Sequence, residues 1–199
     1  LANPMNGEVR VAGETISLSA HASCFYVVTD FAVAALPRED NNAFTVLKTN
    51  FCPWKITFLN TGKRITSDSL FDWTTSKAPS IKYYSGTAVY TTTFNIEGRG
   101  RSFLDLGNVQ NIASVYVNGI CCGTVWMAPY MVDITSAVKA GKNTLKIDVT
   151  NTWANALLGS DLGTPPFAGI WTNAKYRRAE KTLLPAGLLG PEIKMIVEK

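Results

Sequence analysis

The sequence has little of what many catalytic and metal sites require. It contains one histidine, His21, and four cysteines without any Cys-x-x-Cys pair, so it shows no zinc pattern. No Gly-x-Ser-x-Gly elbow is present, and Gly98-Arg99-Gly100 lacks the following helix that a phosphate site requires. These absences argue against nucleophilic triad catalysis, structural zinc and nucleotide binding.

Charge of one sign and long apolar runs are also scarce. The chain has 19 Lys and Arg residues and 15 Asp and Glu residues, and a net charge of +4 this scattered does not indicate a nucleic-acid partner. The tightest basic cluster, Lys175, Arg177, Arg178 and Lys181, is typical of a solvated face. No apolar run reaches the roughly 18 residues of a transmembrane helix, so we expect no membrane partner.

The cysteines leave the redox compartment open. Cys121 and Cys122 are neighbours in a predicted strand, where successive side chains point to opposite faces, so we expect one buried and one outward thiol. Cys24 and Cys52 could form a disulfide. Because the chain begins at Leu1 without a methionine or a signal-peptide pattern, we interpret it as a fragment whose targeting signal lies upstream.

What the sequence does contain is strand periodicity. Between Asn143 and Thr150, apolar and polar side chains alternate, which is typical of a half-buried strand. Asn118-Gly119 lies between two β-branched runs and predicts a tight hairpin, because both residues tolerate positive φ. Further strand patterns occupy residues 54–58, 87–96, 101–106 and 192–197. Roughly eight or more strands at this short spacing predict an all-β, antiparallel sandwich rather than a βαβ fold.

Other regions depart from this pattern. Thr135 could N-cap a single helical turn, which would make a corner rather than a helix. After Asn151 the pattern breaks for about forty residues, and the apolar content of this connection predicts that it packs against its own sandwich or a partner domain. Near the N-terminus, strand-like runs at 15–19 and 24–28 precede a polar, turn-rich linker at Pro37–Asn42.

The acidic residues give no recognisable catalytic pair. Glycoside hydrolysis needs two carboxylates about 5 to 10 Å apart, and 15 acidic residues make chance pairs easy. Asp105 and Asp133 lie at predicted strand ends beside Gly107 and Thr135, where a carboxylate ordinarily caps backbone N–H groups. We therefore predict structural roles for both.

Aromatic side chains are the candidates for carbohydrate contact, because the apolar face of a pyranose stacks on a flat ring while polar neighbours bind the hydroxyls. The candidates are Trp126 and Tyr130 at a strand-to-strand corner, and Trp153, Asn155 and Trp171 in the long connection. Alternation assigns three other aromatic residues to the core, namely Trp54, Tyr90 and Phe94.

Several motifs, in a fixed order, carry a family resemblance. They are Asp105-Leu106-Gly107, Val115 to Gly119, Pro129 to Thr135 and Gly141 to Asn151. Together they resemble the sugar-binding jelly-roll domain of glycoside hydrolase family 2. Two more segments, Ile81 to Gly86 and Leu188 to Pro191, resemble the C-terminal sandwich of the family 106 α-L-rhamnosidases. The resemblance covers residues from about 50 to 199 and implies a galactose-binding-like jelly roll.

The resemblance also implies a parent protein. Residues 1–42 would be a β segment from a preceding module plus a linker, and residues 43–199 the galactose-binding-like jelly-roll sandwich. The parent would be a secreted or periplasmic bacterial glycoside hydrolase whose catalytic acids lie on a (β/α)₈ barrel outside this chain. We therefore expect no catalytic residue, cofactor or metal ligand here. Domains of this fold often hold a structural calcium, but no dense acidic loop indicates one.

The resemblance is incomplete where charge could reach a sugar. Residues 151–161 resemble an Asn-x-Trp-x-Asn-Arg run of the rhamnosidases, but Ala156 stands at the arginine position. Met127 stands where a lysine is common. These differences remove charges that could have bonded a sugar or the catalytic domain.

Three functions fit these features. The first is a non-catalytic accessory domain that braces the catalytic barrel of the same polypeptide and contributes to carbohydrate binding. The second is an autonomous carbohydrate-binding module, which requires at least two of Trp126, Tyr130, Trp153 and Trp171 to be exposed and roughly coplanar. The third is a structural spacer domain that contacts no sugar.

Overall fold

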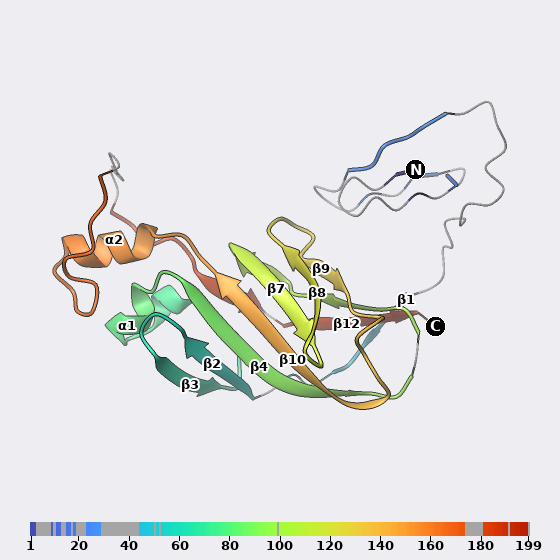
Figure 1. Cartoon of the computed structure of the whole chain (residues 1–199), viewed down its shortest axis with the longest axis horizontal. Coiled ribbons are helices and arrows are strands. Elements are labelled where there is room, and N and C mark those ends of the chain that lie inside the picture. Colours follow the sequence, from blue (N-terminus) through green and yellow to red (C-terminus); the bar gives the residue numbers. More distant parts are fainter. Residues whose placement is uncertain are drawn as a thin grey trace.

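The computed structural model describes residues 1–2, 9, 11–12, 15–16, 18, 23–28, 44–49, 51, 53–98, 100–173, 181–190 and 192–198. In this part of the chain, two antiparallel sheets enclose one hydrophobic core (Figure 1). A two-stranded sheet and short helices are added at the margins. The architecture is the predicted all-β sandwich.

The larger sheet has six strands in the order β3–β2–β4–β10–β7–β8. Their bounds are β2 Trp54–Phe58, β3 Lys63–Ser67, β4 Thr87–Ile96, β7 Ile112–Val117, β8 Ile120–Val125 and β10 Gly141–Thr150. All neighbouring strands are antiparallel, and β4 pairs with β10 along their whole lengths. These two long strands form the centre of the sheet.

The smaller sheet has four strands in the order β1–β12–β5–β9. Their bounds are β1 Phe44–Leu47, β5 Ser102–Asp105, β9 Met131–Asp133 and β12 Lys194–Glu198. The two-stranded sheet pairs β6, Asn108–Gln110, with β11, Gly187–Gly190. Because β1 and the C-terminal β12 are neighbours, both ends of the sandwich sequence lie in one sheet.

The alternation that predicts strands also predicts which side chains are buried. In β10, Leu145, Ile147 and Val149 are at most 1% exposed and face the core. The hairpin between β7 and β8 turns at Asn118 and Gly119, whose φ values of 51° and 84° confirm the predicted positive-φ turn. The buried face of β10 and the β7–β8 hairpin therefore follow from local sequence signals.

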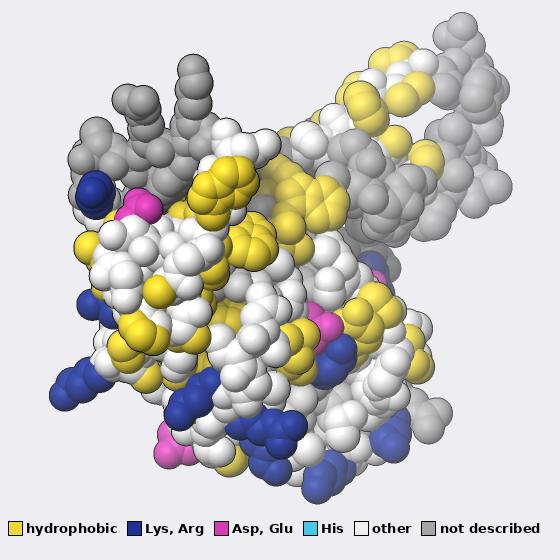
Figure 2. Space-filling view, turned by 60° about the vertical axis from the view of Figure 1, so that its left-hand side comes forward, with side chains coloured by type: hydrophobic (Ala, Val, Ile, Leu, Met, Phe, Trp, Pro, Cys, Tyr) yellow, Lys and Arg dark blue, Asp and Glu magenta, His cyan; other side chains and the backbone are white. Residues whose placement is uncertain are grey.

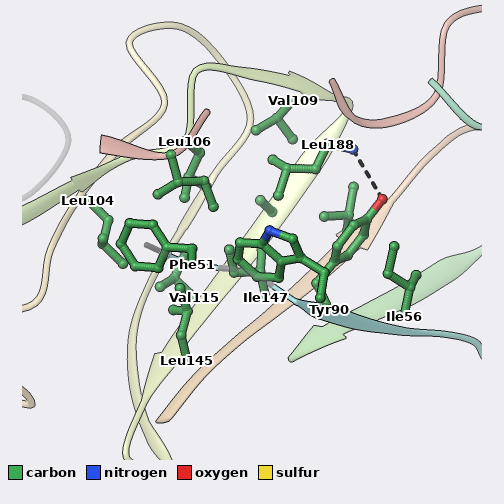
Figure 3. Close-up of a cluster of buried hydrophobic side chains, with 14 of the residues drawn as sticks. Phe51, Ile56, Tyr90, Leu104, Leu106, Val109, Val115, Leu145, Ile147 and Leu188 are labelled. Atoms are coloured by element: carbon green, nitrogen blue, oxygen red, sulfur yellow. Dashed lines mark hydrogen bonds between the residues drawn. The ribbon is translucent and has the colours of Figure 1, made fainter. Parts of the chain in front are cut away.

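Aromatic side chains fill the space between the sheets. The predicted core residues Trp54, Tyr90 and Phe94 are at most 2% exposed. The Tyr90 hydroxyl accepts hydrogen bonds from the Trp73 indole N–H at 2.6 Å and from the Leu188 backbone N–H at 3.4 Å, the latter drawn in Figure 3. Burial raises the pKa of Tyr90 to about 12. This hydroxyl links the central strand β4 to Trp73, which lies before it in the chain, and to β11, which lies after it.

The helical elements were not predicted. A 3₁₀ turn spans Trp73–Thr75, and α1 spans Pro79–Lys82. The connection after Asn151, predicted to lack regular structure, contains α2, Ala154–Asp161, as well as β11. Helix α2 follows Trp153, whose side chain provides no capping hydrogen bond, so the N-cap position lacks the residue type that usually marks a helix start.

Two local expectations were wrong. Thr135 is not an N-cap: its hydroxyl accepts from the Ser102 N–H at 2.9 Å, and the turn that follows is closed on the Ile134 carbonyl. Residues 24–28 form no regular strand, since of these only Phe25 makes a β-bridge, with Ala2. Phe25 to Val28 are 62% to 81% exposed, whereas a continuous apolar run is typical of a strand covered on both faces.

Three of the four cysteines are described in the structure, and several other predicted features are not. Cys121 is exposed, whereas Cys122 packs partly against the core, and burial raises the pKa of its thiol. Cys24 is a free thiol. Four features lie outside the described residues, namely His21, Cys52, the linker at 37–42 and the Lys175–Arg178 cluster. None of the described helices is long and apolar enough to cross a membrane.

Candidate functional site

A groove of about 760 Å³ lies where α1, α2 and the β2–β3 turn meet. Its lining residues are Asn60, Thr61, Lys63, Pro79, Ser80, Ser85, Trp153, Ala156, Pro165, Pro166, Phe167 and Ile170. Figure 2 turns this end of the molecule forward and shows hydrophobic side chains gathered on it, with Lys and Arg side chains along the lower part of the face. The groove thus combines an apolar surface with hydroxyl, amide and ammonium groups.

Buried Ser85 holds two walls of the groove together. Its hydroxyl oxygen accepts a hydrogen bond from the Ala156 N–H in the first turn of α2, at 3.0 Å. Its backbone carbonyl accepts from the Asn60 side-chain amide in the β2–β3 turn, also at 3.0 Å. Ser85 is 4% exposed, so these bonds form where water competes little. The turn and the helix are therefore fixed relative to each other.

Tyr84 holds the β2–β3 turn, which forms one wall of the groove. Its hydroxyl donates to the Thr87 carbonyl at 2.7 Å and accepts from the Asn60 backbone N–H at 3.2 Å. Burial of this side chain raises the pKa of its hydroxyl. Asn151 reinforces the segment, because its amide donates to the Tyr84 carbonyl and accepts from the Gly86 N–H.

The opposite wall is the loop that follows α2. The Ser160 hydroxyl donates to the Ile170 carbonyl at 2.7 Å and closes this loop back on the helix. Phe167 is 5% exposed and anchors the loop. Gly159 lies against the Tyr83 ring so closely that a Cβ atom there would lie 2.9 Å from the Tyr83 Cβ. The loop is therefore packed onto its own domain.

Trp153 is the predicted residue that lines this groove. Trp153 is 62% exposed, so it gives the groove an accessible aromatic side chain. Trp171 is 80% exposed and follows the groove residue Ile170, but it does not itself line the groove. The two tryptophans are thus both accessible, and the structure places one of them in a concave setting.

Asn155 has a different place from the one predicted. It is 2% exposed, and its amide donates to the Leu184 carbonyl and accepts from the Leu184 N–H, both at 2.8 Å. It clamps α2 to the segment that leads into β11. Since these bonds occupy the amide in the interior, Asn155 does not belong to the open groove.

Trp126 and Tyr130 lie at the β8–β9 corner, away from the groove lining. Trp126 is 54% exposed and is flanked by the exposed side chains of Met127 and Met131, at 45% and 40%. Tyr130 packs partly against the core, and its carbonyl accepts from the Leu106 N–H at 2.9 Å. We call Trp126, Met127 and Met131 the corner patch.

Three carboxylates, those of Asp72, Asp105 and Asp133, have structural partners. Asp105 accepts from the Gly107 N–H and Asp133 from the Thr135 N–H, both at 2.9 Å, which confirms the predicted turn-capping roles. Asp72 caps the 3₁₀ turn at the Thr74 N–H and also accepts from the Ala186 N–H. Among the described residues, no group of three His, Cys, Asp or Glu side chains could hold a metal ion.

The other groove residues were not predicted as site residues from the sequence. Asn60 and Thr61 carry a turn signal but no indication of a site, and the motif match at 81–86 does not single out Ser85. Lys63 is an ordinary polar residue at a strand start. These side chains converge only because the β2–β3 turn, α1 and α2 meet in the folded chain, so no local spacing could reveal the groove.

The chain is similar to a known protein family and to individual known proteins. Residues 59–177 match the family described as glycosyl hydrolase 2 galactose-binding domain-like. A protein of Formosa agariphila named "Putative beta-glucuronidase" is 35% identical over 178 residues, covering 73% of this chain and 15% of that protein. The structure of a rhamnosidase from Novosphingobium sp. PP1Y is also 35% identical, with a TM-score of 0.74 over 84% of this chain and 16% of that one.

More distant structures share the fold. A β-D-glucuronidase from Dictyoglomus thermophilum is 20% identical, with a TM-score of 0.54 over 82% of this chain and 29% of that one. The present chain thus spans about one sixth of the first two relatives, 15% and 16% of their lengths. The family match covers more than half of the sequence and agrees with the observed sandwich. The chain belongs to the glycosyl hydrolase 2 galactose-binding domain-like family, and its resemblance to the rhamnosidases is confirmed.

Proposed function

We propose that this chain is a non-catalytic accessory domain of a secreted glycoside hydrolase and braces that enzyme's catalytic barrel. One observation carries the proposal: among the described residues that line the groove, none is a carboxylate. Hydrolysis of a glycoside by a pair of acids needs both at the bond that is cleaved. Asp105 and Asp133 instead cap backbone turns.

The lengths of the relatives support an accessory role. The chain corresponds to 16% of the rhamnosidase and 15% of the glucuronidase homologue, so most of each relative lies outside the matched domain. A catalytic barrel in the remainder would supply the acids that the groove lacks. The corner patch would then contact this barrel, because clustered exposed apolar side chains commonly mark docking surfaces.

The purified chain is expected to be inactive on aryl glycosides. We expect no release of 4-nitrophenol from 4-nitrophenyl α-L-rhamnopyranoside or β-D-glucuronide above the rate in buffer. A rhamnosidase and a glucuronidase assayed in parallel would show that each substrate is competent. Turnover by the chain at an enzyme-like rate of about 1 s⁻¹ or faster would contradict a non-catalytic role.

A second function, carbohydrate binding, is favoured by the setting of Trp153. An exposed indole ring beside hydroxyl and amide groups has the composition of a sugar-binding surface. Ser85 fixes the turn and helix that flank the ring, so the surface is formed before any ligand arrives. In this role the groove would extend the substrate site of the parent enzyme or bind a glycan by itself.

A further inference from the structure

We infer that the groove at Trp153 binds a pyranoside that carries a negative charge, with the sugar ring on the indole and the anionic group near Lys63. The inference rests on the proposed carbohydrate-binding role and adds the chemical class of the ligand. The anionic group is a carboxylate, as in a uronic acid, or a sulfate ester. The two sources share the same charge and are separated by experiment.

The charge of the groove carries the inference. Lys63 is the charged side chain among the described lining residues, and none of them is acidic. The structure gives Lys63 no ion pair with a described carboxylate. An ammonium group without an ion-pair partner, beside an apolar surface, attracts an anion electrostatically. A neutral sugar gains no such attraction, so we expect the charged sugar to bind more tightly.

The hydrogen-bonding groups suit a sugar rather than a small inorganic anion. The Ser80 hydroxyl lines the groove and has no hydrogen bond to a described residue, so it can donate to or accept from a ligand hydroxyl. The Asn60 amide nitrogen donates a hydrogen bond to the Ser85 carbonyl. The amide oxygen of Asn60 takes no part in that bond and can accept a hydrogen bond from a ligand. An inorganic anion has no apolar face to stack on the Trp153 ring, whereas a pyranose has one.

The size of the groove fits one or two sugar units. About 760 Å³ lies inside the range of roughly 300 to 1,000 Å³ that is common for small-molecule sites. Pro165 and Pro166, from the loop after α2, also line the groove and add to its apolar surface. A monosaccharide or disaccharide is therefore the expected unit of recognition.

Calorimetry on the full chain tests the inference with matched ligand pairs. The uronate arm compares digalacturonate and methyl β-D-glucuronide with their methyl esters, which keep the sugar ring and lose the charge. The sulfate arm compares galactose 6-sulfate with galactose. We expect one charged member to bind at least fivefold more tightly than its neutral partner, and we expect added salt to weaken that binding.

Variants connect the binding to the named residues. Lys63→Gln should weaken the charged ligand about fivefold and leave its neutral partner unchanged. Trp153→Ala should abolish binding of both, because the stacking surface is lost. Lys142→Gln is the matched control: Lys142 is exposed at the start of β10 and does not line the groove, so binding should stay at the wild-type level.

The outcomes separate the inference from the proposed function. Equal affinity for charged and neutral partners, or an unchanged Lys63→Gln variant, would overturn the charge inference and leave carbohydrate binding at Trp153 standing. No heat with any ligand at millimolar concentration would overturn both the inference and the binding role. That result would leave the accessory, non-catalytic role unaffected, because the hydrolysis assay tests this role separately.

Discussion

Replacing Gly187 by alanine is expected to cost about 2 to 5 kcal/mol of the free energy of unfolding. Gly187 begins β11 with φ at +107°, a conformation that L side chains rarely adopt. A Cβ atom there would lie 2.7 Å from Cε2 and 2.8 Å from Cδ1 of Trp73. Trp73 is fully buried and hydrogen-bonded to Tyr90, so its ring cannot move away without breaking the core.

Urea denaturation followed by tryptophan fluorescence measures this loss. Gly141→Ala is the matched control, because Gly141 has a φ of +83° but a Cβ atom added there would meet nothing within 4 Å. That variant should lose only the backbone term, about 1 to 2 kcal/mol. Equal losses for the two variants would show that Trp73 does not hold the space beside β11.

Asn143→Ala is expected to cost about 3 to 5 kcal/mol, because it removes a fully buried amide that makes four hydrogen bonds. The Asn143 amide donates to the carbonyls of Lys139 and Gly141 at 2.7 and 2.9 Å. Its oxygen accepts from the Asn118 amide at 2.7 Å and from the Lys139 N–H at 2.9 Å. Asn143 is 0% exposed, so its amide makes these bonds away from bulk water.

The same denaturation experiment includes Asn95→Ala as a control. Asn95 is exposed on β4 and has no side-chain hydrogen bond to a described residue. Its loss should stay within about 0.5 kcal/mol. A small effect of Asn143→Ala, close to that of the control, would mean that the β7–β8 hairpin and the 137–141 corner do not depend on this amide.

The strands and the core were predictable because they follow from local periodicity. The pattern of β10 indicates both the strand and its buried face, and the observed bounds of β4 are those of the predicted 87–96 segment. Asn118-Gly119 predicted a hairpin whose geometry depends on two adjacent residues. Such signals need no knowledge of the rest of the chain.

Helix α2 and the groove were not predictable in the same way. The residue before α2 is a tryptophan without a capping side-chain bond, and the helix is held by Ser85 and Leu184, which are distant in sequence. Trp153 could be proposed from its chemistry, whereas Lys63 became a candidate only when the fold placed it on the same groove. Asn155 shows the converse error, since a polar residue two positions after Trp153 proved to be an internal clamp.

The central claim, that this accessory domain binds carbohydrate in the groove at Trp153, is tested most directly by mapping the ligand on the chain. Amide and indole NMR spectra would be recorded while digalacturonate is added and, in a second titration, while galactose 6-sulfate is added. We expect shifts of the Trp153 indole N–H and of the Asn60 and Ser80 amides, with the Trp126 indole unchanged. Shifts confined to the corner patch, or spectra that change with neither ligand, would contradict the claim.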